Sequence, residues 1–308
     1  MIGITDVASY LPPDMLSNLE RAAGFDRTPE FVRDKIGFLR LRRKAREEET
    51  SDLCVRAFEA LEAKRALDHR AIDCLVVCTQ NPDAHGLPHT AAVLHAKLGL
   101  GQQVAAFDIS LGCSGFVYSL GVTSAFMEAS GLKNGLLFTS DPYSKILAPD
   151  DADTALLFGD AATVTYLTAT PVYRALKSRY ASDGRLAHSI QVAEAGGRLS
   201  MLGSNVFKFT MTAVPEQIEA CLEDNGLSKH EIDLYLFHQG SKFIVDNLSR
   251  KLGLDPARAP FEAAETGNTV SSTLPLMLER RLHIGPRRIL MSGFGVGLSW
   301  ATTVLERV

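Results

Sequence analysis

Two kinds of secondary structure meet in the stretch Ala106-Phe-Asp-Ile-Ser-Leu-Gly-Cys-Ser-Gly-Phe-Val-Tyr-Ser-Leu120. The run Val104–Ile109 is typical of a buried strand, it ends in a turn of small residues around Cys113, and a helical pattern begins at once. The sequence therefore predicts a thiol at a helix N-terminus. Unsatisfied backbone N–H groups there carry partial positive charge, which favours thiolate over thiol. Because a thiolate is a nucleophile, the first hypothesis is covalent catalysis through a thioester.

The chain contains five cysteines, and a free cysteine usually acts as a small buried hydrophobe. Cys54 and Cys221 fall in helical patterns, whereas Cys74 and Cys78 bound a strand-like run. The spacing shows no CxxC pair and no nearby pair of histidines, which argues against a zinc site. Local context alone leaves two interpretations of Cys113 open, a catalytic nucleophile and a core residue.

Size and charge exclude several classes of protein. The 308 residues are enough for one large domain or two fused ones, and the net charge of −4 gives no broad basic field for nucleic acid. The basic cluster Arg40–Arg46 is followed by three glutamates, so a solvated surface segment is at least as good an interpretation as an anion site. No apolar run approaches a membrane span, and the N-terminus has the pattern of a first strand and not of a signal peptide. An odd number of cysteines without a disulfide pattern favours the reducing cytoplasm.

Short apolar strands alternate with helical patterns along the whole chain, which indicates an α/β fold. The strand-like runs are Cys74–Cys78, Val104–Ile109, Gly135–Thr139, Ala162–Leu167, Ile190–Ala193, Leu234–Phe237, Arg288–Ser292 and Ser299–Leu305. The helical segments 59–73 and 219–233 also match at five of fifteen positions, and each leads into a strand. Chance could produce this similarity, but two related α/β halves, residues 1–168 and 169–308, are the economical interpretation. A site at the carboxyl ends of their strands would lie between them.

Two polar side chains in the second half could complete a site. His238 follows the apolar strand Leu234–Phe237 and precedes a helix. The plainer interpretation is a histidine that only forms hydrogen bonds with backbone groups. A neutral imidazole at this position could, however, donate a hydrogen bond to a developing oxyanion. Asn268 follows a glycine, as many turn residues do, yet its amide could also donate into a cleft.

A glycine-rich turn, Ser292-Gly-Phe-Gly-Val-Gly-Leu-Ser-Trp300, lies between two strands near the C-terminus. The turn lacks the following helix and the acidic residue of a dinucleotide-binding fingerprint, so we reject NAD binding. Backbone N–H groups of such a turn could form half of an oxyanion hole.

Cys113, His238 and Asn268, in this order and with this terminal turn, resemble the type III β-ketoacyl-acyl carrier protein synthases of the thiolase superfamily. The resemblance covers nearly the whole chain. It includes further motifs: Phe31-Val-Arg-Asp-Lys-Ile-Gly-Phe with Arg42-Arg43, Glu49-Thr-Ser-Asp52, the Leu87-Pro88 turn, Phe158-Gly-Asp160 and Asn205-Val-Phe-Lys208. It implies a thiolase-like five-layered αβαβα fold, usually paired as a homodimer.

The resemblance also implies a ping-pong mechanism without a bound cofactor or metal. Cys113 would be acylated by an acyl thioester such as acyl-coenzyme A, while the backbone N–H groups of Cys113 and Val296 stabilise the oxyanion. Malonyl-acyl carrier protein would then lose carbon dioxide, with His238 and Asn268 donating to the enolate oxygen. Its carbanion would attack the acyl-cysteine. The product would be a β-ketoacyl thioester for fatty-acid or secondary-metabolite synthesis.

The substrate-binding positions depart from the family pattern. Ser204 and Ser241 stand where pantetheine-contacting asparagines are frequent. Phe31 and Ala152 replace the Trp and Arg that stack adenine in the best-known members; the motif containing Phe31 also supplies Lys35 to this site. Leu87 stands where a bulky Phe can shorten the acyl pocket. These changes predict a primer-specialised paralogue, with a longer acyl-coenzyme A or a carrier-bound primer in place of acetyl-coenzyme A.

Two further expectations stay open at the level of sequence. A basic patch for an acidic carrier protein would consist of Lys208, Lys242, Arg250 and Lys251, although ordinary solvated helix charges explain them equally well. The alternative to condensation is transfer of the acyl group to an oxygen, nitrogen or sulfur acceptor without a new carbon–carbon bond. A catalytically silent partner subunit is a third possibility, against which the joint presence of Cys113, His238 and Asn268 argues.

Overall fold

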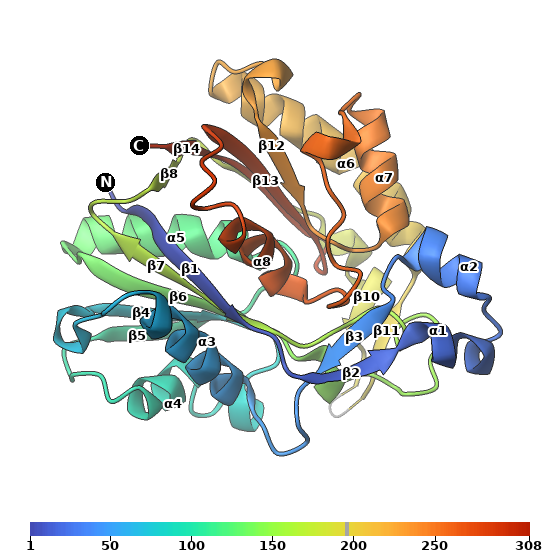
Figure 1. Ribbon diagram of the computed structural model, residues 1–308, viewed down its shortest axis with the longest axis horizontal. Coiled ribbons are helices and arrows are strands. Elements are labelled where there is room, and N and C mark those ends of the chain that lie inside the picture. Colours follow the sequence, from blue (N-terminus) through green and yellow to red (C-terminus); the bar gives the residue numbers. More distant parts are fainter. Residues whose placement is uncertain (195–196) are drawn as a thin grey trace.

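The computed structural model describes residues 1–194 and 197–308. Figure 1 shows a mixed α/β molecule built around a large sheet of ten strands. The strands of this sheet are β1 (Gly3–Tyr10), β4 (Cys74–Cys78), β5 (Ala105–Ile109), β6 (Asn134–Ser140), β7 (Ala162–Thr168), β8 (Tyr173–Ala175), β9 (Arg179–Ser182), β12 (Leu234–Phe237), β13 (Arg288–Gly295) and β14 (Ser299–Arg307). Two small two-stranded sheets join β2 (Asp14–Ser17) with β3 (Arg40–Arg43) and β10 (Ile190–Val192) with β11 (Leu199–Met201).

The helices are distributed along the whole chain. They are α1 (Asn18–Arg21), α2 (Pro29–Phe31), α3 (Thr50–Lys64), α4 (Thr90–Lys97), α5 (Gly115–Ser130), α6 (Gly203–Asp224), α7 (Lys242–Lys251) and α8 (Thr273–Glu279), with the π-helix η2 (Val32–Ile36) after α2. Short 3₁₀ turns are η1 (Ala22–Phe25), η3 (His69–Ala71), η4 (Asp83–Gly86), η5 (Tyr143–Lys145), η6 (Gly184–Ser189), η7 (Lys229–Glu231), η8 (Pro256–Arg258) and η9 (Val270–Ser272).

The order of strands divides the sheet at β1 and β8. The order is β12-β13-β14-β8-β1-β7-β6-β4-β5, with β9 also pairing β14, and only Ile4 and Tyr173 connect β1 with β8. All strands on one side of this junction come from residues 3–168, and all on the other from residues 173–307. We keep the division into halves 1–168 and 169–308 as a proposal that this order supports.

Helices cover both faces of each part of the sheet. Helices α3 and α4 pack on the outer face of the first part and α6 on the outer face of the second, with α7 against α6, while α5 and α8 contact strands of both parts. Strand β4, Cys-Leu-Val-Val-Cys, is therefore buried on both faces, as its continuous apolar run predicts. The resulting layers are helix, sheet, helix, sheet and helix, so the predicted α/β architecture is confirmed.

The predicted strands are confirmed with small differences at their ends. The runs at 74–78 and 234–237 match β4 and β12, and the run at 288–292 continues to Gly295 in β13. The N-terminal strand is confirmed as β1. The short strands β2, β3, β8, β9 and β11 were missed because they have too few residues for an alternating pattern.

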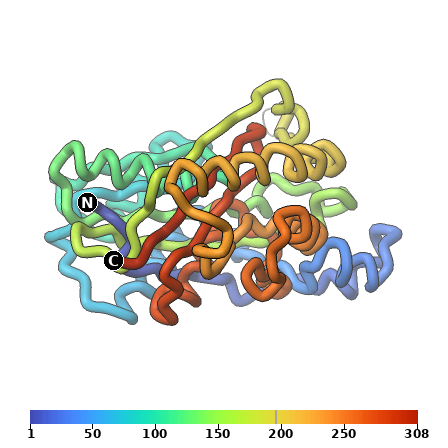
Figure 2. The backbone as a smooth tube through the Cα atoms, turned by 90° about the horizontal axis from the view of Figure 1, so that it is seen from above, coloured from blue at the N-terminus to red at the C-terminus, as the bar shows by residue number. Residues whose placement is uncertain are grey.

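The first half extends a segment over the second. Within residues 18–36, which form α1, η1, α2 and η2, the part that lies beside α7 is α2 with η2 (Figures 1 and 2), and η2 contacts α7. At Gly37 (φ +81°) the chain passes so close to Lys242, the first residue of α7, that a Cβ would overlap the lysine side chain, and it would also lie 2.8 Å from the ring of Phe261. This contact brings residues of both halves to one opening.

Candidate active site

A cavity of about 500 Å³ lies where the two halves meet. Its inner end is formed by buried residues, among them Cys113, Tyr143, Phe158, His238 and Asn268. Its outer end is lined by exposed or half-buried residues of η2, α6 and α7 and the segments before them: Phe31, Lys35, Ser204, Phe207, Ser241 and Phe243. The cavity therefore runs from a mouth to a buried nucleophile, and it contains all three residues predicted as catalytic.

Cys113 lies in the turn between β5 and α5, as the sequence predicts. The Gly115 N–H donates to the Gly112 carbonyl at 2.8 Å, and helix α5 starts at Gly115. Strand β13 passes so close to this turn that a Cβ on Gly293 would lie 2.6 Å from the Cys113 carbonyl oxygen. A Cβ on Gly295 would lie 2.8 Å from the sulfur itself. The glycines of the terminal turn are thus required by the approach of the second half to the thiol.

The thiol is protonated in the resting protein. Cys113 is only 6% exposed, and burial raises its pKa to about 12, with the nearby Asp141 carboxylate adding to the increase. The backbone N–H groups of Val296 and Cys113 act in the opposite direction and lower that pKa. The expectation that the helix end makes Cys113 a thiolate at neutral pH is therefore wrong for the resting chain: desolvation outweighs the helix end.

The same two N–H groups are placed as the predicted oxyanion site requires. They point at the sulfur now, and an acyl group on the sulfur would place its oxygen near them. The side chain of Val296 does not disturb the turn, because the left-handed conformation falls on Gly297 (φ +136°) and not on the valine. In this arrangement backbone N–H groups, and not a side chain, would bind the oxyanion.

His238 follows strand β12 and is buried and neutral. Its N–H donates to the Ser292 carbonyl of β13 at 2.9 Å, which fixes the backbone at the strand end. Its ring Nδ1 lies 2.9 Å from the Thr273 hydroxyl, and the ring meets Phe294 edge-on at 5.6 Å between centroids. Burial lowers the pKa of His238 to about 3, so the imidazole stays uncharged near neutral pH.

Asn268 is held by contacts with both halves. Its N–H donates to the Leu157 carbonyl at 2.9 Å, and its carbonyl accepts from the Gly159 N–H at 3.0 Å. The side-chain Oδ1 accepts from the Val270 N–H at 2.9 Å. Since a backbone N–H needs an acceptor, this bond identifies the oxygen and leaves the Nδ2 group free to donate into the cavity.

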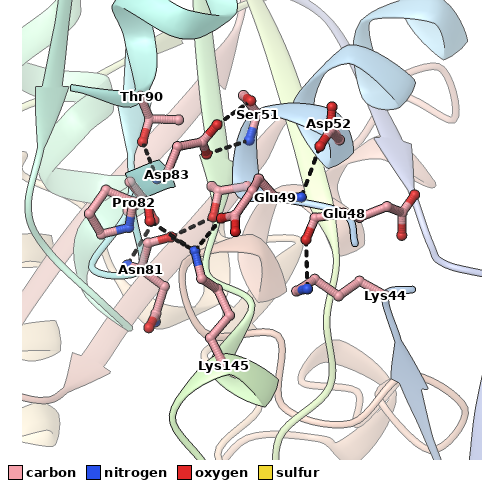
Figure 3. Close-up of polar contacts among 12 residues, drawn as sticks. Lys44, Glu48, Glu49, Ser51, Asp52, Asn81, Pro82, Asp83, Thr90 and Lys145 are labelled. Atoms are coloured by element: carbon pink, nitrogen blue, oxygen red, sulfur yellow. Dashed lines mark hydrogen bonds and ion pairs between the residues drawn. The ribbon is translucent and has the colours of Figure 1, made fainter. Parts of the chain in front are cut away.

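A polar network behind the cavity holds the loop after β4. Figure 3 shows that Lys145 contacts both Glu49 and the Pro82 carbonyl and that Asp83 accepts from the Ser51 N–H. The two Lys145 bonds are 2.6 and 2.8 Å long, and the bond to Asp83 is 2.9 Å long. Lys145 belongs to the same 3₁₀ turn as Tyr143. The loop and the inner wall of the cavity are therefore fixed to one another.

The residues of the site suit acyl-transfer chemistry. Among residues 1–194 and 197–308, no group of three or more His, Cys, Asp or Glu residues is placed to hold a metal ion. A thiol, two convergent N–H groups and two neutral side-chain donors can form a thioester and stabilise oxyanions.

Comparison with known proteins agrees with this chemistry. Residues 107–184 match the family model described as 3-Oxoacyl-[acyl-carrier-protein (ACP)] synthase III, and residues 222–307 match the model of its C-terminal part. The β-ketoacyl-[acyl-carrier-protein] synthase III of Streptococcus pneumoniae serotype 19F (strain G54) is 31% identical over 98% of both chains. The chain belongs to the β-ketoacyl-acyl carrier protein synthase III family.

Solved structures confirm the fold of this synthase III family member. A 3-oxoacyl-(acyl-carrier protein) synthase from Burkholderia xenovorans LB400 superposes with a TM-score of 0.91 at 32% identity, covering 99% of this chain and 94% of the other. The priming β-ketosynthase from the R1128 polyketide biosynthetic pathway superposes with a TM-score of 0.90 at 26% identity, covering 100% and 96%. The predicted thiolase-like fold is therefore confirmed. In the described part of the chain no helix has the length and apolarity needed to cross a membrane.

Four of the five predicted substrate-binding residues of this synthase lie on the cavity: Phe31, Lys35, Ser204 and Ser241. The Lys35 ammonium lies 4.4 Å from the centre of the Phe243 ring, and the Ser241 hydroxyl accepts from the Ile244 N–H at the start of α7. The fifth residue, Leu87, is 87% exposed and does not line the cavity of the single chain, nor does Ala152. This placement does not support a role of Leu87 in the acyl pocket of its own chain, and such a role stays a prediction.

The predicted carrier-protein patch lies on two helices that pack together, α6 and α7. Lys208 and Arg250 are exposed, but Lys242 pairs with Asp246 and Lys251 donates to the Met211 carbonyl. Two of the four cations thus already have partners within the chain. Binding of a carrier protein at this patch stays a prediction.

Sequence reasoning missed four cavity or supporting residues. Tyr143 and Phe243 line the cavity without belonging to any motif considered, and the aromatic ring of Phe207 stacks on that of Phe243 at 5.1 Å. Thr273 touches His238 from 35 residues away. In the sequence, only the place of Phe207 in the motif Asn205-Val-Phe-Lys208 indicated that it could belong to the site. No sequence pattern indicated the contact of Thr273 with His238.

Proposed function

We propose that this chain is a condensing acyltransferase that loads an acyl primer on Cys113 and extends it with a malonyl thioester. The observation that carries the proposal is one cavity that is lined by Cys113, with two backbone N–H groups directed at its sulfur, and by the side chains of His238 and Asn268, which are neutral and can donate hydrogen bonds. Acylation of a thiol needs only the two backbone N–H groups, whereas decarboxylation of a malonyl thioester also needs the side-chain donors of His238 and Asn268.

In the first half-reaction, the sulfur of Cys113 forms a bond with the carbonyl carbon of the primer thioester. The oxyanion accepts from the N–H groups of Cys113 and Val296. When the tetrahedral intermediate collapses, the donor's carbon–sulfur bond breaks and its thiolate takes up the proton that Cys113 has lost. Since the pKa of the resting thiol is about 12, this proton must leave as the bond forms.

In the second half-reaction, a malonyl thioester loses its carboxylate as carbon dioxide. The electron pair of the broken carbon–carbon bond forms an enolate, whose oxygen accepts from His238 and Asn268. Its carbon attacks the acyl-cysteine, and the carbon–sulfur bond to Cys113 breaks to give the β-ketoacyl thioester and a Cys113 thiolate. Because the pKa of the resting thiol is about 12, this thiolate then takes up a proton from water, which restores the starting protein. Both donors are neutral, so they stabilise the enolate without protonating it; a single lost donor of this kind costs about a hundred- to a thousandfold in rate.

The mouth of the cavity supports a thioester donor with a long flexible arm. Phe31, Lys35, Ser204 and Ser241 line the passage that a pantetheine arm would follow to the sulfur. Coenzyme A and an acyl carrier protein present the same arm, so acyl-coenzyme A and malonyl-acyl carrier protein are the proposed substrates. The β-ketoacyl product would enter fatty-acid or secondary-metabolite synthesis.

We also propose a homodimer in which β5 meets its copy. Strand β5 ends the order of the large sheet and its residues are only half-buried. Phe107 of this strand contacts Phe126, which is exposed on α5 together with Val122. An edge strand beside exposed apolar side chains favours pairing with a second chain.

The test measures the two half-reactions separately. Mass spectrometry of the protein after exposure to acyl-coenzyme A reports acylation, and carbon dioxide release from malonyl-acyl carrier protein reports decarboxylation. We expect Cys113→Ala to abolish acylation, and His238→Ala to spare acylation but to slow decarboxylation. Acylation without any carbon dioxide release would instead support simple acyl transfer to another acceptor, and unchanged activity of Cys113→Ala would support a silent subunit.

A further inference from the structure

The hydroxyl of Thr273 lies between two acceptors, the ring Nδ1 of His238 and the carbonyl of Val270. The Oγ1 to Nδ1 distance is 2.9 Å and the Oγ1 to carbonyl distance is 3.1 Å. All three residues are buried. Because a hydroxyl has one proton, it can donate to only one of the two acceptors at a time.

The choice of acceptor decides which nitrogen of His238 carries the proton. If Thr273 donates to Nδ1, that nitrogen is bare and the neutral ring carries its proton on Nε2. If Thr273 donates to the Val270 carbonyl, Nδ1 must donate to the hydroxyl and Nε2 is bare. Only the first tautomer can donate from Nε2 to a substrate oxygen.

The geometry favours the first arrangement. A hydroxyl-to-carbonyl hydrogen bond is usually about 2.5–3.0 Å long, so 3.1 Å to Val270 is long, whereas 2.9 Å suits a bond to a ring nitrogen. The Val270 carbonyl already accepts from the Thr273 backbone N–H, so it does not depend on the hydroxyl. Among the described residues, the Thr273 hydroxyl is the one hydrogen-bond partner of Nδ1, so the direction of this single bond sets the tautomer.

The turn that places Thr273 also orients the second donor. Val270 has φ +54°, a left-handed conformation that is rare for a β-branched residue. Its N–H binds Oδ1 of Asn268, which turns the Asn268 amide donor toward the cavity, and its carbonyl lies beside the Thr273 hydroxyl. Strain of this kind concentrates at sites where a precise arrangement is needed. One turn thus controls the direction of both side-chain donors.

We propose that Thr273 is a positioning residue that keeps His238 in the tautomer with its proton on Nε2. This inference rests on the proposed function, in which Nε2 donates to the enolate oxygen. Thr273 touches no substrate and acts only through the histidine.

The tautomer can be measured without any variant or substrate. In protein labelled with ¹⁵N-histidine, the shifts of bare and protonated ring nitrogens differ widely, and the signal that disappears in His238→Gln identifies His238. We expect a bare Nδ1 and a protonated Nε2 near neutral pH. A protonated Nδ1 in the wild-type protein would overturn the inference.

Variants of Thr273 test the consequence for catalysis. Thr273→Val keeps the shape and removes the hydroxyl, and Thr273→Ser keeps the hydroxyl and removes the methyl group. We expect Thr273→Val to slow decarboxylation by about tenfold or more, but by less than the roughly hundred- to thousandfold of a lost donor, and to leave acylation of Cys113 unchanged. Thr273→Ser should restore most of the rate. Equal loss in both half-reactions, or no rescue by serine, would contradict a positioning role.

The two proposals fail in different ways. If His238→Ala decarboxylates malonyl-acyl carrier protein as fast as wild type, the proposed role of His238 is wrong whatever its tautomer. If His238→Ala is slow but Thr273→Val is not, the role of His238 stands and that of Thr273 is wrong. Should Thr273→Val not fold, Thr273→Ala and the wild-type spectrum still decide the question.

Discussion

Replacing Tyr143 should change the length of the primer that Cys113 accepts. Tyr143 is 3% exposed at the inner end of the cavity, and its ring packs on Phe158 at 4.8 Å between centroids. Its hydroxyl donates to Gln80 at 3.1 Å. With the carrier arm in the mouth, as we propose, an acyl chain on Cys113 would extend toward this inner end, and the tyrosine ring would limit its length.

The size of the effect follows from burial. Tyr143→Ala opens space next to the existing cavity, and each methylene that enters it contributes about 0.8 kcal/mol, roughly fourfold in binding. Acyl chains several carbons longer than the wild-type optimum should therefore gain about one to two orders of magnitude relative to it. The free energy of unfolding should fall by about 3–5 kcal/mol, as for other buried aromatic residues replaced by alanine.

The matched control is Tyr143→Phe, which keeps the ring and removes only the hydroxyl. The lost bond to Gln80 should cost about 1 kcal/mol of stability without any shift in preferred length. The assay is mass spectrometry of acylated Cys113 with competing straight-chain acyl-coenzyme A thioesters. If Tyr143→Ala folds and keeps the wild-type length preference, Tyr143 does not close the acyl end and this assignment of the cavity is wrong.

Three further outcomes follow from the site. The rate of Cys113 alkylation by iodoacetamide should rise about tenfold per pH unit from pH 6 to 10 without levelling off, because burial holds the thiol pKa at about 12. A plateau of that rate near pH 7 would instead show that the resting cysteine is a thiolate. Gly295→Ala should slow acylation sharply, since its Cβ would lie 2.8 Å from the sulfur, whereas Gly101→Ala, where nothing lies within 4 Å, should not. Burial raises the pKa of Asp141 from 3.8 to about 6, so the fold favours the protonated acid, and stability present below pH 4 is lost as pH rises through 6. Relative to Asp141→Asn, the wild type should therefore lose about 2 kcal/mol of unfolding free energy between pH 4 and 7, and parallel urea-unfolding profiles of the two proteins would contradict this shift.

The sequence predicted the elements that depend on local pattern. Strand β4 was found because it is buried on both faces and reads as a continuous apolar run. The turn of Cys113 was found because a strand, small residues and a helix follow one another without interruption. His238 and Asn268 were recognised by their order and spacing together with the terminal turn, a family resemblance that local pattern alone would not have supplied.

The properties that depend on distant neighbours could not be predicted in this way. The helix end is visible in sequence, but the burial that raises the thiol pKa comes from packing of β13 and Tyr143 around Cys113. The exposure of Leu87 follows from the path of its loop. Thr273 gains its role only because α8 begins beside the end of β12, which no spacing of residues reveals.

The site depends on contacts between the halves as much as on the residues that perform the chemistry. Asn268 of the second half forms a bridge with Phe158 of the first, and Ser271 donates to Asp141. Gly293 and Gly295 bring β13 against the turn of Cys113. Because the proposed nucleophile belongs to residues 1–168 and both proposed side-chain donors to residues 169–308, this interface sets the distance between the Cys113 sulfur and those donors. A change that loosens it, without touching any reacting group, should therefore impair condensation more than loading of the primer.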